Sequence, residues 1–160
     1  MLAASAYAEH FKFMGIPLDG PLPQFEKALL AKGFTPTSVE TNEPNYTWYD
    51  GIFAGQNALV GVSITPKSKI VFAVGVSFSE LTPSESKDLF ERLCKAVERN
   101  YPSFKKENDT NDPDAIASYR YFDLNLGSIQ VSRFKDNDVV IAYLDVKNTY
   151  TNELEMTEDI

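Results

Sequence analysis

Hydrophobic and polar residues follow helical spacing and then strand alternation, and this order occurs twice along the chain. In the first block, Leu22, Phe25 and Leu29 recur every three or four residues, and Gly33 ends the pattern. This spacing predicts an amphipathic helix. Period-two alternation then predicts three strands, over residues 46–54, from 57 or 58 to 65, and over 69–79.

The strand predicted over residues 69–79 has one bulky face and one face of small residues. We expect the bulky set to face the core: Ile70, Phe72, Val74, Val76 and Phe78. The other face carries only smaller side chains, and we expect it to admit a close neighbour or to be lightly covered: Val71, Ala73, Gly75 and Ser77.

The second block repeats the order with a clearer helix start. Residues 82–85, Thr-Pro-Ser-Glu, match a capping box with proline at the first helical position. This motif predicts a helix that runs to about residue 100, with Leu89, Leu93 and Val97 on its apolar face. A polar loop over residues 103–115 should follow, and then three strands over 118–126, 128–135 and 139–147.

An opening strand over residues 10–18 gives the predicted order β-α-βββ-α-βββ. Because short turns join the strands, we expect an α+β fold with a curved antiparallel sheet of six to seven strands and two helices on one face. The domain should span residues 9–148, and the polar, acidic tail over 149–160 should fray. The order is similar to that of β-lactamase-inhibitor-like and TATA-binding-protein-like folds, a likeness of shape that implies no function.

Composition narrows the classes of function. The chain has 160 residues and a net charge of −8, which fits one domain and argues against a nucleic-acid-binding protein. It has one cysteine and one histidine, Cys94 and His10, which are too few for a disulfide or a zinc site. Neither a nucleophile elbow nor a phosphate-binding loop occurs in the sequence. We therefore expect no cofactor, no metal and no catalytic residue.

The N-terminus carries a pattern that bears on location. Ala6-Tyr7-Ala8 places small side chains at the two positions that signal peptidase requires, directly before Glu9. We interpret residues 1–8 as the remnant of a signal peptide, or otherwise as a disordered start, and expect a periplasmic or secreted protein. A cytoplasmic protein with an ordinary small-residue start is the alternative. No apolar run is long enough to span a membrane.

The segment after this pattern resembles a known group of proteins. Residues 15–20, Gly-Ile-Pro-Leu-Asp-Gly, precede a helix that ends in Lys32-Gly33-Phe34. This opening resembles that of small uncharacterised exported proteins of Bacteroides-type gut bacteria, which begin with a strand, a turn of this kind and a helix with a similar end. The resemblance covers only the start of the chain. It implies export and assigns no catalytic residue.

Carboxylates within strands offer one route to chemistry. Asp50, Asp123 and Asp145 lie in predicted strands, where aspartate is disfavoured. Two of them facing each other across a sheet would allow acid–base catalysis in a hydrolase or lyase. The alternative is that all three point outward into solvent.

Alternation in the last three strands assigns one set of residues to the core and the other to solvent. The predicted core set is Phe122, Leu124, Leu126, Ile129, Val131, Val140, Ala142, Leu144 and Val146. The predicted outer set is Tyr119, Tyr121, Asp123, Asn125, Gln130, Ser132, Tyr143 and Asp145. Trp48 and Asp50 share one face of the strand predicted over residues 46–54, and they could belong to the same outer face.

A sheet face that mixes Tyr and Trp with Asp, Asn and Gln is typical of protein interfaces and of platforms on which sugars stack. The leading hypothesis is therefore a non-enzymatic module that binds a protein or carbohydrate through Trp48, Asp50, Tyr119, Tyr121, Asp123, Tyr143 and Asp145. A homodimer that uses the same face as its interface is an alternative. The structural alternative is that aromatic residues simply favour strands.

Overall fold

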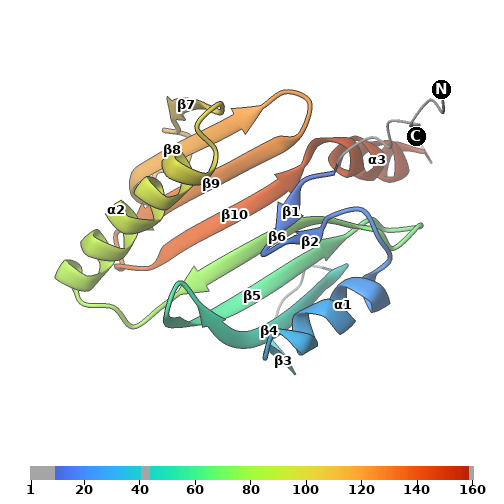
Figure 1. The fold of residues 1–160 in the computed structure, drawn as a ribbon, viewed down its shortest axis with the longest axis horizontal. Coiled ribbons are helices and arrows are strands. Elements are labelled where there is room, and N and C mark those ends of the chain that lie inside the picture. The colour runs from blue at the N-terminus through green and yellow to red at the C-terminus, as the bar shows by residue number, and fades with distance from the viewer. Residues whose placement is uncertain (1–9, 41–43, 159–160) are drawn as a thin grey trace, which may run out of the picture.

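Figure 1 shows an antiparallel sheet with helices α1 and α2 on one of its faces. The computed structural model describes residues 10–40 and 44–158, so the signal-peptide pattern at residues 1–8 lies outside the described part of the chain. A short hairpin of β1 (Lys12–Phe13) and β2 (Ile16–Pro17) precedes α1. We call the side of the sheet that carries α1 and α2 the helix face, and the opposite side the open face.

Two units of one helix and four strands build the main sheet. The first unit consists of α1 (Leu22–Ala31), β3 (Thr35–Thr37), β4 (Tyr46–Phe53), β5 (Gln56–Ile64) and β6 (Val71–Phe78). The second unit consists of α2 (Pro83–Asn100), β7 (Lys105–Asn108), β8 (Ala115–Asp123), β9 (Gly127–Phe134) and β10 (Val139–Asp145). Helix α3 (Val146–Thr157) follows β10 without a loop.

The strand order is β3-β4-β5-β6-β10-β9-β8-β7, so the two units join where β6 pairs with β10. Each unit is a meander that starts at an outer edge and ends at the centre. From either edge to the centre, the four strands of a unit therefore follow one another in the order in which they occur in the chain. Both outermost strands are short, which limits the unpaired backbone at the sheet edges.

The α+β class and the antiparallel sheet are confirmed, but the counts of elements are different from those predicted. The described residues form eight strands in the main sheet, two more in the hairpin, and three helices. The opening strand predicted over residues 10–18 is the β1–β2 hairpin, in which Met14 and Gly15 both adopt positive φ values of 50° and 79°. Strand β7 lies inside the predicted loop, and α3 occupies most of the tail that we expected to fray.

Helix α2 begins as its capping box predicts. The Thr82 side chain accepts a hydrogen bond from the backbone N–H of Glu85, and the Glu85 carboxylate accepts one from the backbone N–H of Thr82, both at 3.2 Å. Leu89, Leu93 and Val97 are all buried against the helix face. The local motif and the apolar stripe agree, which explains why this element was predictable.

The core lies between the helix face and the elements that cover it. Most of its strand residues come from the four central strands, and Tyr49 of β4 and Tyr121 of β8 extend it on both sides. Phe13 and Leu18 from the hairpin segment and Phe25 and Leu29 from α1 cover them. The bulky residues Val74, Val76 and Phe78 of β6 are buried there as predicted. The predicted alternation does not hold for Ile70 and Phe72, because the register between β5 and β6 shifts after Ser63.

Candidate functional site

The open face of the four central strands forms a regular grid of small and apolar residues. Three rows cross β5, β6, β10 and β9 through paired positions, and the middle row runs from Gly61 through Gly75 and Ala142 to Gln130. We call the members of these rows the central face: Leu59, Gly61, Ser63, Ala73, Gly75, Ser77, Val140, Ala142, Leu144, Ser128, Gln130 and Ser132. Not one of them carries a charge, although charged residues make up 24% of the chain.

Charged and aromatic side chains border the central face on the flanking strands. The same rows continue into β4 through Tyr46, Trp48 and Asp50, and into β8 through Arg120 and Phe122. The guanidinium of Arg120 lies 4.9 Å from the Phe122 ring centroid, and its Nη1 lies 2.9 Å from Glu107 Oε1. An uncharged centre with a polar and aromatic border is the arrangement found in protein interfaces.

Trp48 and Tyr46 form a stacked pair on the β4 side of this face. Their ring centroids are 5.9 Å apart with an interplanar angle of 21°. The Trp48 ring also covers the backbone of Gly61, because a Cβ built at Gly61 would lie only 2.7 Å from Trp48 Cζ3. Beside Tyr46, a pocket of about 570 Å³ opens between the sheet and α3, lined by Ser63, Phe72 and Met156 among others.

The contact of Trp48 with Gly61 gives a prediction for the single tryptophan of the chain. Gly61→Val places a branched side chain where the indole lies, so we expect Trp48 to turn away and become more exposed. Intrinsic fluorescence should shift to longer wavelength and be quenched more strongly by iodide than in the wild-type protein. Gly75→Val is the matched control, because a Cβ at Gly75 meets no atom within 4 Å. Equal spectra for the two variants would contradict the placement of Trp48.

The predicted face of β8 is wrong. Tyr121 is 1% exposed on the helix face, where its hydroxyl donates a hydrogen bond of 3.0 Å to Glu98 Oε1 at the side of α2. Tyr119 stacks on Phe90 of α2 at 5.8 Å, and Lys106 Nζ lies 4.2 Å from the Tyr119 ring centroid. The Tyr121 hydroxyl reaches a polar partner at the edge of the helix, so its ring can be buried while Phe122 faces outward.

The predicted face of β10 is also wrong. Tyr143 is 9% exposed and Asp145 is fully buried, whereas Val140, Ala142 and Leu144 lie on the open face. Both residue sets of β10 are rich in apolar side chains, because the strand is central and neither face is strongly polar. Assignments in β9 are confirmed, since Ile129 and Val131 are buried and Gln130 and Ser132 belong to the central face.

The three strand carboxylates have separate hydrogen-bond partners. Asp145 is saturated by hydrogen bonds from Phe11 N, Asn148 N and His10 Nδ1, at 2.8, 2.9 and 3.0 Å. Asp123 Oδ1 accepts hydrogen bonds from the backbone N–H groups of the turn that follows it. Asp50 lies in the rows of the open face, on the opposite side of the sheet from Asp145. Asp123 and Asp145 both pair with Gly127 and so belong to one row, but each carboxylate has its own hydrogen-bond partners, and neither lines a pocket described here.

Equivalent tyrosines link sheet and helix in the two units. Tyr49 on β4 donates a hydrogen bond to Glu26 on α1, as Tyr121 on β8 does to Glu98 on α2. Burial, followed by the hydrogen bond to Glu26, raises the pKa of Tyr49 to about 12. Burial also raises the pKa of Tyr121 and that of Tyr143 far above the ordinary value of a phenol.

These tyrosines predict an alkaline limit to stability. Their pKa values are higher in the folded state than the unfolded value of about 10, so the unfolded chain loses these protons first as pH rises. The stability that they contribute is fully present below about pH 10 and falls between about pH 10 and 12. Tyrosinate absorbance and circular dichroism should show these groups ionising together with unfolding. Ordinary titration of all eight tyrosines in a folded chain would contradict this.

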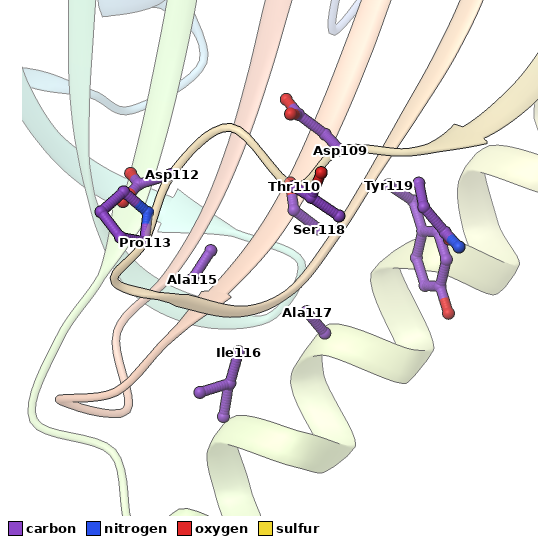
Figure 2. Close-up of a pocket in the computed structure, with 10 residues that line it drawn as sticks. Asp109, Thr110, Asp112, Pro113, Ala115, Ile116, Ala117, Ser118 and Tyr119 are labelled. Carbon is purple, nitrogen blue, oxygen red and sulfur yellow. The ribbon is translucent and has the colours of Figure 1, made fainter.

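A second pocket, of about 420 Å³, lies at the loop between β7 and β8. Figure 2 shows Asp109 and Asp112 on separate parts of this loop and Tyr119 beside α2. The two carboxylates accept hydrogen bonds from the backbone N–H groups of Asn111 and Asp114, so they stabilise turns. Within the described residues, no group of three or more His, Cys, Asp or Glu side chains is placed to hold a metal ion.

The contribution of small residues to the site was not apparent from the sequence. The lightly covered face of residues 73–77 was expected, but its continuation into Gly61 and Ala142 depends on pairing across strands.

None of the helices in the described part of the chain has the length and apolar character needed to span a bilayer. Comparisons with models of protein families, with curated proteins and with solved structures give no significant match to this chain.

Proposed function

We propose that this chain is a non-enzymatic interaction module that binds a partner protein through the open face of its sheet. The observation that carries the proposal is the central face, twelve uncharged residues on a chain of net charge −8. Ser63, Ser128 and Ser132 are themselves buried, and the Asp109 carboxylate reaches the border of this face by accepting a hydrogen bond from Gln130. Charged side chains are common on ordinary protein surfaces, and their depletion at the centre of a patch distinguishes interfaces from the rest of a surface.

The dimensions of the open face support the same proposal. Eight strands spaced about 4.8 Å apart and about seven residues long cover roughly 900 Å². A standard interface buries roughly 800 Å² on each partner. Trp48 and Tyr46 on β4 and Phe122 on β8 supply aromatic anchors at the two borders, a residue type enriched at binding hot spots.

A second copy of the chain is the alternative occupant, and the positions of the flanking residues favour it. Trp48 and Arg120 belong to the same row, two strands from the centre on opposite sides. If two copies paired face to face about an axis parallel to the strands, Trp48 of one copy would lie opposite Arg120 of the other. Such a contact is a cation–π pair. The proposed homodimer would therefore use the same face as the proposed interaction module.

Site-specific photo-crosslinking tests the proposal and separates the two occupants. A photoreactive phenylalanine analogue at Gly75 stands at the middle of the central face, where a Cβ meets no atom within 4 Å. The control places the analogue at Glu91, an exposed residue of α2. In the cells that produce the protein, we expect a discrete adduct from position 75 and none from position 91.

The mass of the adduct identifies the occupant. An adduct of twice the chain mass of 17.9 kDa indicates a second copy, and any other discrete mass indicates a different protein. Equal labelling from positions 75 and 91, or no adduct from either, would contradict the proposal. Ala142→Lys adds a charge beside Gly75 and should abolish the adduct, while the melting temperature stays within a few degrees of the wild-type value.

A further inference from the structure

A pocket on the helix face lies between the β1–β2 hairpin, the β4–β5 turn and α2. Its volume is about 460 Å³, which is within the range of sites that bind small molecules. The apolar lining comes from all three elements and from β10: Met14, Phe53, Leu93, Val97, Ile141 and Tyr143. The pocket is on the opposite side of the sheet from the central face.

Tyr143 is the polar group that points to a ligand. The residue is 9% exposed, and its ring is held between Phe13, at 5.2 Å and 70°, and Phe11, at 6.1 Å. No hydrogen bond joins the Tyr143 hydroxyl to another described residue, and the hydroxyl is not among the fully enclosed polar atoms, so it opens into the pocket that the residue lines. A phenol hydroxyl on an otherwise buried ring usually takes a hydrogen-bond partner, and here that partner has to come from solvent or from a bound molecule. Since Tyr143 lines the pocket, a bound molecule can supply that partner.

Tyr101 and Lys12 add further hydrogen-bond donors to the same pocket. Tyr101 also lines it and also lacks a hydrogen-bond partner among the described residues. Both phenols are protonated at neutral pH, as phenols ordinarily are, and burial raises the pKa of each still further. Lys12 is the single charged side chain among the described lining residues, and no carboxylate accompanies it. The pocket therefore presents an apolar floor with donors and one positive charge.

We infer that this pocket binds a small apolar carboxylate, with the hydrocarbon body between α2 and the hairpin and the carboxylate near Tyr143, Tyr101 and Lys12. A carboxylate accepts several hydrogen bonds and pairs with the ammonium group, while a neutral molecule of the same size loses the ionic contact. Met14, which is 38% exposed at the tip of the hairpin, provides a flexible apolar side chain at the entrance. This inference is independent of the proposed partner surface.

Calorimetry with decanoate as the probe tests the inference, and decanol is the uncharged control. We expect saturable, one-site binding of decanoate that is about tenfold tighter than that of decanol. Tyr143→Phe removes only the hydroxyl and should weaken decanoate binding by about tenfold, as expected for a hydrogen bond to a charged group. Tyr150→Phe, at an exposed tyrosine of α3, should leave the affinity unchanged. Lys12→Met should weaken decanoate binding and leave decanol binding as it is.

A pocket-filling variant separates this site from adventitious surface binding. Ala96 lines the pocket from α2 and is half-buried, so Ala96→Phe should fill the space and abolish binding while the protein still unfolds cooperatively. Decanoate affinity that survives in Ala96→Phe, or the absence of saturable binding to the wild-type protein, would overturn the inference. Ala142→Lys should bind decanoate normally, so failure of the open-face proposal and failure of this inference are distinguishable.

Discussion

Asp145→Ala should lower the free energy of unfolding by about 3 kcal/mol, from the loss of a helix cap at about 1 kcal/mol and an unpaired buried amide at about 1–3 kcal/mol. The carboxylate is fully buried and caps α3 through the backbone N–H of Asn148. Its other oxygen accepts from the N–H of Phe11. One side chain therefore joins the start of α3 to the segment before β1, which is 134 residues away in sequence.

Urea unfolding measures this effect, and Asp50→Ala is the matched control. Asp50 is an exposed strand aspartate, and its replacement should change stability by no more than about 0.5 kcal/mol. Asp145→Asn keeps the shape but turns an amide donor toward N–H groups that need an acceptor, so it should also be destabilising. In a chain of this length, the Asp145→Ala melting temperature should fall by about 6–12 °C. A midpoint for Asp145→Ala equal to that of Asp50→Ala would contradict the structural role of this carboxylate.

Gly127→Ala should be at least as damaging, because the sheet has no space for a Cβ at this position. A Cβ built on Gly127 would lie 2.0 Å from the carbonyl oxygen of Leu144. That oxygen belongs to the backbone of β10, in the ladder where Gly127 pairs with Asp145. The clash can be relieved only by moving one strand away from the other, so we expect a loss of about 3 kcal/mol or more, comparable to severe overpacking.

Gly75→Ala is the control that separates this clash from the general effect of removing a strand glycine. A Cβ at Gly75 meets nothing within 4 Å, and the loss of unfolded-state entropy should stabilise the chain by about 0.5 kcal/mol. Soluble yield and thermal unfolding of the two variants decide the matter. If Gly127→Ala does not fold, its low yield beside a normal yield for Gly75→Ala is the expected result. Equal yield and stability for the two variants would contradict the β9–β10 packing.

The predictable parts of the fold are those in which a local motif and a periodic pattern agree. Helix α2 has both the capping box at Thr82 and an apolar stripe, and β9 alternates clearly between Val131 and its polar neighbours. Helix α3 has neither signal. Only Asn148 is buried among its residues, so capping by Asp145 and polar contacts hold it in place. Periodicity therefore had nothing to detect in a segment that reads as a polar tail.

The site itself was only partly predictable, because strand parity is ambiguous at the centre of a sheet. Trp48 does lie on the open face, but Tyr121 and Tyr143 are buried on the helix face. In β10 both residue sets are apolar, and in β8 a tyrosine hydroxyl finds its partner on α2. Which of the two residue sets of such a strand faces the helices depends on which strands pair. The central face arises from this pairing, since Gly61, Gly75 and Ala142 come from three separate strands.

Thiol labelling at the central face tests whether a partner covers it. Cys94 is buried, so Gly75→Cys introduces an accessible thiol at the middle of the open face. In the dilute purified protein, this thiol should react with a maleimide about as fast as a control thiol at Glu91→Cys. In the cells that produce the protein, labelling at position 75 should be at least tenfold slower than at position 91, because the partner covers the face. Equal labelling rates at the two positions in those cells would contradict a docking role for the open face.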